Sequence, residues 1–116
     1  MQAPTPVFQY PITVLNGQTL SNTVDLSNNS LVGFLAPQIF VTNNVTLEVS
    51  SNGTDWYQVI KDTDATTQVN LYNNVAQATA YKVDISIFAF FKYVRLRFGT
   101  AVTADRVFTL LARPLE

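Results

Sequence analysis

The chain has 116 residues, of which 47% are hydrophobic and 12% aromatic. This length is typical of one domain, and the apolar content excludes intrinsic disorder, which combines low hydrophobicity with high net charge. Charged residues make up only 13% of the chain, and the formal net charge is -1. Because nucleic acids and anionic membranes attract basic surfaces, we expect no nucleic-acid partner and no membrane partner.

Two residue types that carry much of enzyme chemistry, cysteine and histidine, are missing from the sequence. Disulfides, thiolate nucleophiles and imidazole bases or metal ligands are therefore impossible. The aspartates fall mainly at predicted turns, and nothing indicates the facing pair of carboxylates that glycoside hydrolysis requires. Residues 62–64, Asp-Thr-Asp, resemble half of a calcium loop, but the next residues supply neither the further ligands nor the glycine. We predict no enzymatic activity, no cofactor and no metal site.

The chain opens with a proline-bearing segment. Pro4 and Pro6 each remove a backbone donor and bias the preceding residue away from helix, so residues 1–11 are predicted to form an extended arm. The segment lacks the basic and apolar regions of a secretion signal, and no apolar run in the chain is long enough to span a membrane. Pro4, Pro6 and Phe8 are candidate contacts of this arm with a neighbouring protein.

After the arm, hydrophobic residues alternate with polar ones, which is the pattern of half-buried strands. The alternation is clearest over residues 45–50, where Val45, Leu47 and Val49 share one face. It recurs over residues 94–98, with both arginines outward, and over residues 107–113, with Phe108, Leu110 and Ala112 inward. Weaker strands are predicted, in chain order, at residues 12–15, 18–26, 31–35, 56–60, 68–72 and 79–83.

Turn signals separate these strands at residues 16–17, 27–30, 43–44, 52–53, 62–64 and 73–74. Short strands at such intervals, with turns rich in asparagine and glycine, are typical of all-β sandwiches. We predict one domain over residues 12–116, an antiparallel β-sandwich of jelly-roll type with about eight strands.

The segment Ser50-Ser51-Asn52-Gly53-Thr54-Asp55-Trp56-Tyr57 is the most specific local pattern. Asn52-Gly53 between two strands favours a type I′ hairpin, since both central residues then need positive φ. On a structural interpretation, Trp56 anchors the hairpin in the core. On a functional interpretation, Trp56 and Tyr57 form an exposed platform for a sugar.

Two further clusters have a structural and a functional interpretation. In the apolar stretch 85–93, a two-faced strand cannot hide every large ring, so Phe88, Phe90 and Phe91 either form a subunit interface or tuck under the sandwich edge. Arg95 and Arg97 share the outer face of one strand. They either bind an anionic partner or are solvated or paired with cross-strand acids such as Glu48.

In this order and spacing, the chain resembles small accessory structural proteins found on or near the heads of tailed bacteriophages. The motifs involved include the Asn-Gly turn followed by Trp56, a turn that also occurs in galactose-binding-like sandwich modules, which recognise carbohydrates. The sequence departs from the phage pattern at Phe90, Phe91 and Phe98, where small or polar residues are commoner. The segments that carry the resemblance are residues 21–26, 31–37, 50–57, 84–88, 92–100 and 106–115.

This resemblance implies a β-sandwich that acts as a capsid decoration or cement protein, or as the base of a head fibre. The implied partner is the major capsid protein or another virion protein, and the implied assembly is a homo-oligomer, with a trimer favoured. The implied location is the virion, after synthesis in the cytoplasm of the bacterial host. The family supplies no catalytic residues. The alternative function is a carbohydrate-binding module that uses Trp56 and Tyr57.

Overall fold

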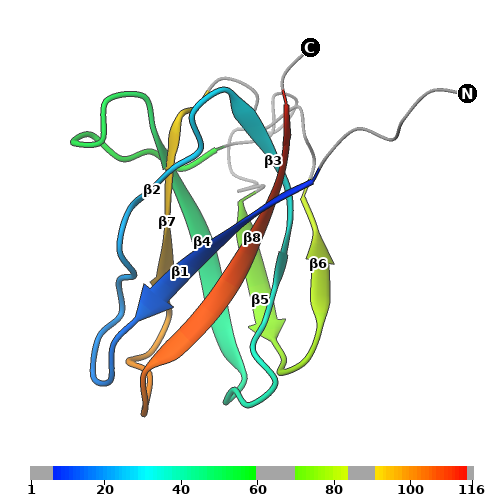
Figure 1. Cartoon of the computed structure of the whole chain (residues 1–116). Helices are drawn as coiled ribbons and strands as arrows, with labels where there is room; N and C mark the ends of the chain where they lie inside the picture. The colour runs from blue at the N-terminus through cyan, green and yellow to red at the C-terminus, as the bar shows by residue number, and fades with distance from the viewer. Residues whose placement is uncertain (1–6, 60–69, 84–90, 115–116) are drawn as a thin grey trace, which may run out of the picture.

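The fold is a sandwich of two antiparallel four-stranded sheets, seen in a computed structural model that describes residues 7–59, 70–83 and 91–114 (Figure 1). Within these residues no helix is long and apolar enough to cross a bilayer. The strands are β1 (Phe8–Val14), β2 (Val24–Asp25), β3 (Asn29–Leu35), β4 (Asn43–Ser50), β5 (Leu71–Val75), β6 (Ala80–Lys82), β7 (Tyr93–Phe98) and β8 (Arg106–Pro114).

The strand order is that of a jelly roll. One sheet has the order β1-β8-β3-β6 and the other β2-β7-β4-β5. Strand β1 pairs with β8, β2 with β7, β3 with β6 and β4 with β5, as if one long hairpin had been wound around the core. The β3–β8 and β4–β7 pairings then complete each sheet. The predicted antiparallel sandwich of jelly-roll type is thus confirmed.

The core lies between the sheets and follows the predicted alternation. The inward residues of the three clearest strands are buried: Val45, Leu47, Val49, Val94, Leu96, Phe98, Phe108, Leu110 and Ala112. At one end of the core, Phe108 packs against three other rings. Its ring centroid lies 5.0 Å from Phe40, 5.5 Å from Phe98 and 6.3 Å from Phe34. These rings come from both sheets and from the β3–β4 loop, so Phe108 joins all three.

Strand β1 is longer than predicted. Residues 8–11, which the sequence assigned to the extended arm, form the first half of β1 and pair with β8 from Phe8↔Ala112 to Pro11↔Thr109. Pro11 fits because β1 is the edge of its sheet. A proline can occupy a position of an edge strand whose nitrogen is turned away from the neighbouring strand.

The predicted strand over residues 18–26 is mostly wrong, because this segment crosses from one sheet to the other. The Ser21 amide donates to the Leu96 carbonyl in one sheet, and the Asn22 amide donates to the Thr13 carbonyl in the other. The Asn22 side chain also accepts from the Thr13 amide, at 2.7 Å. A segment bonded to both sheets cannot form a ladder with either, so only Val24–Asp25 is a strand.

Two predicted turns, at residues 43–44 and 73–74, are wrong for a shared reason. Asn43 and Asn44 open β4, and Asn73 and Asn74 lie inside β5, at a register shift between these two strands. Asn74 has a φ of 56°, and its amide donates to the Asn44 side chain at 2.9 Å. Asparagine tolerates the left-handed conformation, so it occurs in β-bulges as well as in turns, and an Asn-Asn pair alone does not distinguish the two.

The four edge strands are poor templates for strand addition. Strand β2 has 2 residues and β6 has 3. Strand β1 carries Pro11, and β5 contains the irregularity at Asn74. Short, proline-bearing or bulged edges resist pairing with another chain. Contacts with a partner are therefore more favourable on the sheet faces or the loops.

We predict that Phe108→Ala destabilises the protein by about 3–5 kcal/mol, because it removes the ring shared by both sheets and the β3–β4 loop. Urea unfolding followed by circular dichroism measures this. The matched control is Val107→Ala on the same strand. Val107 is 50% exposed, so its loss should cost under about 1 kcal/mol. Equal costs for the two variants would contradict the assignment of Phe108 to the core.

Candidate functional site

The predicted interface residues are only partly within the described structure. Phe91 is half-buried and packs against the core, as expected if this ring tucks under the edge of the sandwich. Phe8 is 42% exposed at the start of β1. Pro4, Pro6, Phe88 and Phe90 lie outside the described residues, so an interface built on them stays a prediction.

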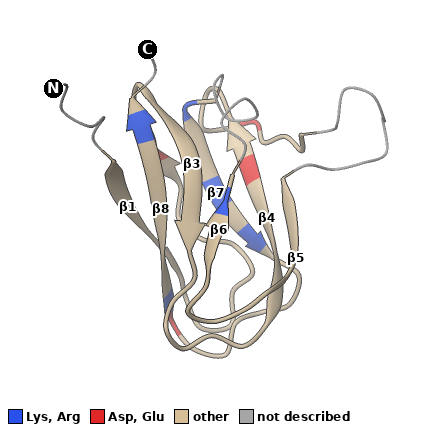
Figure 2. Ribbon diagram, turned by 90° about the vertical axis from the view of Figure 1, so that its right-hand side faces the viewer, with Lys and Arg blue, Asp and Glu red and all other residues tan. Residues whose placement is uncertain are grey.

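The outer face of the β1-β8-β3-β6 sheet is a broad surface with little charge. Three rows of cross-strand neighbours form it: Gln9, Leu111, Gly33 and Lys82; Pro11, Thr109, Leu35 and Ala80; and Thr13 with Val107. Lys82 on β6 and Arg113 near the end of β8 carry its charges (Figure 2). We call the uncharged residues of these three rows the neutral face. Its middle offers threonine, leucine, proline and alanine, which are short or moderately sized side chains.

The outer face of the β2-β7-β4-β5 sheet carries a charged network instead. Glu48 on β4 accepts from Arg95 Nε at 2.7 Å and from Arg97 Nε at 2.8 Å, both on β7. Of the interpretations offered for these arginines, pairing with Glu48 is the one that the structure shows. Burial alone would raise the pKa of Glu48, but the hydrogen bonds and charges of Arg97 and Arg95 outweigh burial and hold that pKa below its ordinary value.

Trp56 belongs to this network and not to the core. The Arg95 guanidinium lies 4.2 Å from the centroid of the Trp56 ring, which is a cation–π contact. The structural interpretation of Trp56 as a core anchor is therefore wrong. Tyr57 follows it in sequence and is 51% exposed. The two rings remain candidates for a glycan platform, with Arg95 over the indole.

The loop before Trp56 explains this position. Between Ser50 and Trp56 only Gly53 has a positive φ, of 79°, so the predicted type I′ turn, which needs two such residues, is wrong. The Ser50 hydroxyl accepts from the amides of Asn52 and Gly53, and the Asn52 side chain accepts from the amides of Thr54 and Asp55. These bonds close a wider loop, and pairing resumes only at Val49↔Tyr57. Side-chain bonds to the backbone favour such loops over tight hairpins.

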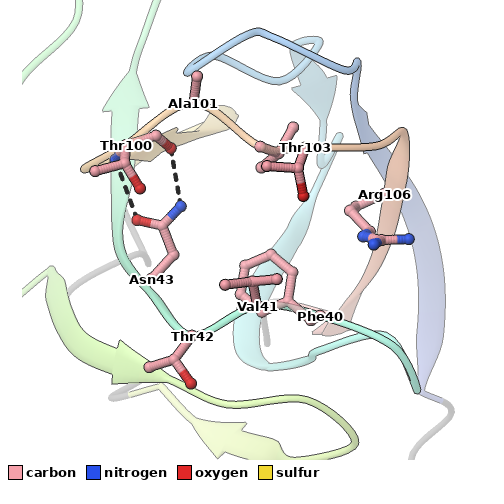
Figure 3. Close-up of a pocket in the computed structure, with 9 residues that line it drawn as sticks. Phe40, Val41, Thr42, Asn43, Thr100, Ala101, Thr103 and Arg106 are labelled. Atoms are coloured by element: carbon pink, nitrogen blue, oxygen red, sulfur yellow. Dashed lines mark hydrogen bonds between the residues drawn. The ribbon is translucent and has the colours of Figure 1, made fainter.

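A site that the sequence analysis missed lies where the β3–β4 and β7–β8 loops meet. Nine residues line a hollow of about 120 Å³ there: Phe40, Val41, Thr42, Asn43, Thr100, Ala101, Val102, Thr103 and Arg106 (Figure 3). One signal was present in the sequence, since Ile39 and Val41 are large apolar residues in a predicted loop. The partner loop is about 60 residues further on, and no local pattern connects the two.

The fold and these surfaces define a class, a small jelly-roll β-sandwich with one neutral and one charged sheet face. No known protein family matches the sequence, and no curated protein matches it. Among solved structures, the chain is similar to the SPBc2 prophage-derived protein YomS. The identity is 10%, the TM-score is 0.59, and the similarity covers 97% of this chain and 99% of that chain. The likeness supports the fold of the described residues.

We predict that Glu48→Gln lowers the free energy of unfolding by about 1 kcal/mol at pH 7. This loss lies between those measured for breaking exposed salt bridges and buried ones. The folded-state pKa of Glu48 is lowered, so its pairing stabilises the fold fully above the ordinary value of 4.5. This stabilisation is lost as the pH falls through the folded-state pKa. The difference between the variant and the parent protein should therefore shrink toward pH 3 in urea titrations.

The control for this experiment is Asp25→Asn. Asp25 lies 3.8 Å from Lys92, and both side chains are about half exposed, so this pair contributes little. A Glu48→Gln difference that stays constant from pH 7 to pH 3 would contradict the role of the ionised pair.

Proposed function

We propose that the chain is a non-catalytic structural protein of a phage particle that docks on another virion protein through its neutral face. The observation that carries this proposal is the difference between the two sheet faces. One face holds Glu48, Arg95 and Arg97 in a paired network, and the other is nearly uncharged over three strands. Moving an uncharged surface of this kind out of water costs little free energy.

Physical costs of association favour the neutral face. Burying an unpaired charge costs several kcal/mol, and fixing a long flexible side chain costs about 0.5–1.5 kcal/mol. Thr109, Leu35 and Pro11 lie in the middle of the face. They carry no charge and have short or moderately sized side chains, so burying them adds little of either cost. They lie on a hydrogen-bonded sheet, so the backbone is ordered before any partner binds.

Two likenesses support a phage setting. The similar solved structure is that of a prophage-derived protein, matched over nearly its whole length. The sequence also resembles accessory head proteins. On this basis we propose that the chain acts in the virion as a decoration or cement protein, or as a head-fibre base, bound to the major capsid protein or a neighbouring virion protein. A homotrimer is the assembly we propose.

A second candidate function is carbohydrate binding, and the 51% exposure of Tyr57 next to Trp56 favours it. Trp56 is the one tryptophan in the chain, so its fluorescence reports directly on this site. If the platform binds sugars, a glycan panel should contain a ligand that shifts the emission saturably, and Tyr57→Ala should remove the shift. Emission that no glycan changes would eliminate this candidate.

For docking through the neutral face, we predict that Thr109→Arg weakens co-sedimentation with phage particles or capsids at least about tenfold, or about 1.4 kcal/mol. The substitution puts a long charged side chain between Pro11 and Leu35. The matched control is Thr46→Arg, at an outward position of the other sheet between Arg97 and Leu71. This variant should bind like the parent chain.

Native mass spectrometry of the same variants tests the assembly. If the neutral face also joins copies of the chain, Thr109→Arg should shift the oligomer toward monomer and Thr46→Arg should not. Thermal unfolding confirms that both variants are folded. Equal binding of the parent chain and Thr109→Arg to particles would refute docking through this face.

A further inference from the structure

The loop end of the sandwich, which we define by the β1–β2, β3–β4, β5–β6 and β7–β8 loops, is a surface distinct from the neutral face. It lies opposite the end at which β1 starts and β8 finishes (Figure 1). Three large apolar side chains are exposed there: Leu15 at 56%, Ile39 at 70% and Val41 at 67%. Of these, Val41 lines a concave site, and exposed apolar residues beside such a site are typical of contact surfaces.

The hollow of about 120 Å³ described above is one concave site of this end, and a second one, which Leu15 lines, lies along the β1–β2 loop. Phe40 forms part of the floor of the hollow and is only 6% exposed, because its ring packs on Phe108 and Phe98. Figure 3 shows Thr103 and Arg106 on one side of the hollow and Asn43 with Thr100 on the other. Val41 lies at its rim and belongs to the exposed apolar group.

The walls of the hollow are fixed before any ligand arrives. The Asn43 side chain donates to the Thr100 carbonyl at 2.9 Å and accepts from the Thr100 amide at 3.2 Å. The Val102 carbonyl accepts from the Gly17 amide, and the Val102 amide donates to the Gln18 carbonyl. The β7–β8 loop is thus tied to β4 on one side and to the β1–β2 loop on the other. Such preorganisation lowers the entropy cost of binding.

Arg106 gives the hollow its chemistry. Within the described part of the chain, the ion pairs use Lys92, Arg95 and Arg97, and Arg106 takes part in none of them. Its side chain is nevertheless half-buried against the hollow. A guanidinium presents a rigid fork of donors that matches a carboxylate, and a partly desolvated one gains most from such a partner.

We propose that this hollow binds the carboxylate side chain of an aspartate or glutamate on a partner protein. A volume of about 120 Å³ is smaller than the roughly 300–1,000 Å³ of small-molecule pockets and close to the size that holds one ring or one side chain. The Arg106 guanidinium pairs with the carboxylate, and the Thr103 hydroxyl lies beside it. Apolar residues flanking the acid cover Val41 and Ile39, so charge and apolar area act together.

The first experiment uses capped peptides as probes and two-dimensional NMR of the ¹⁵N-labelled full chain. Acetyl-Gly-Glu-Gly-amide should shift the amides of Thr103 and Arg106 and the Arg106 Nε signal saturably, with a Kd of about 1–10 mM, as suits one pair in a small site. The isosteric acetyl-Gly-Gln-Gly-amide should bind at least tenfold more weakly. Arg106→Gln should weaken glutamate binding at least tenfold.

The matched control is Arg113→Gln, because Arg113 lies on the same strand, β8, but near its far end. This variant should bind the glutamate peptide like the parent chain. The proposal is overturned if the glutamate and glutamine peptides bind equally, if Arg113→Gln is as impaired as Arg106→Gln, or if the saturable shifts map to Arg95 and Arg97.

A second arm separates a protein partner from a small free acid. Acetyl-Leu-Glu-Leu-amide should bind about tenfold more tightly than acetyl-Gly-Glu-Gly-amide, because a leucine that covers Val41 or Ile39 removes apolar area from water. Ile39→Ser, at an exposed residue that does not line the hollow, should reduce this advantage without changing the binding of the glycine peptide. If both peptides bind equally, the hollow recognises free carboxylates and the docking proposal fails. Neither Arg106 nor Ile39 belongs to the neutral face, so this result is independent of docking there.

Discussion

The packing of Phe108 is the interaction on which the rest of this structure depends. Its ring touches Phe34 in its own sheet, Phe98 in the other sheet and Phe40 in the β3–β4 loop. These contacts set the two sheets against each other and fix the loop that forms part of the hollow. The neutral face and the hollow are therefore presented by one rigid core, and a partner meets them largely as they stand.

The alternation that builds the core also distributes charge between the two outer faces. Strands β4 and β7 turn Glu48, Arg95 and Arg97 outward together, and both arginines pair with the one carboxylate. Strand β8 turns Val107, Thr109 and Leu111 outward, where nothing needs to be neutralised. The short, proline-bearing and bulged edges add a further restriction, since they disfavour strand addition.

The sequence was most informative where the structure obeys a local period. Alternation over residues 45–50 and 94–98 predicted the buried side chains and put Glu48, Arg95 and Arg97 on outer faces. Their pairing, one of the interpretations offered, follows from β4 lying beside β7. It failed where side chains bond the backbone. Asn74 bends a strand without ending it, and Ser50 and Asn52 widen a loop that looked like a tight hairpin. The hollow could not be predicted, since it depends on two loops that only the wound strand order brings together.

The neutral face and the loop end lie on different sides of the same core. A protein bound flat on the neutral face would leave the hollow beside Arg106 open, because the two loops that line the hollow lie at the end of the sandwich (Figure 1). With both surfaces occupied, one chain would hold two neighbours at a fixed distance through two weak contacts of different chemistry. Linked weak contacts bind far more tightly together than apart. Salt should then weaken the contact at Arg106 and spare the uncharged one, so the two contacts can be separated by ionic strength alone.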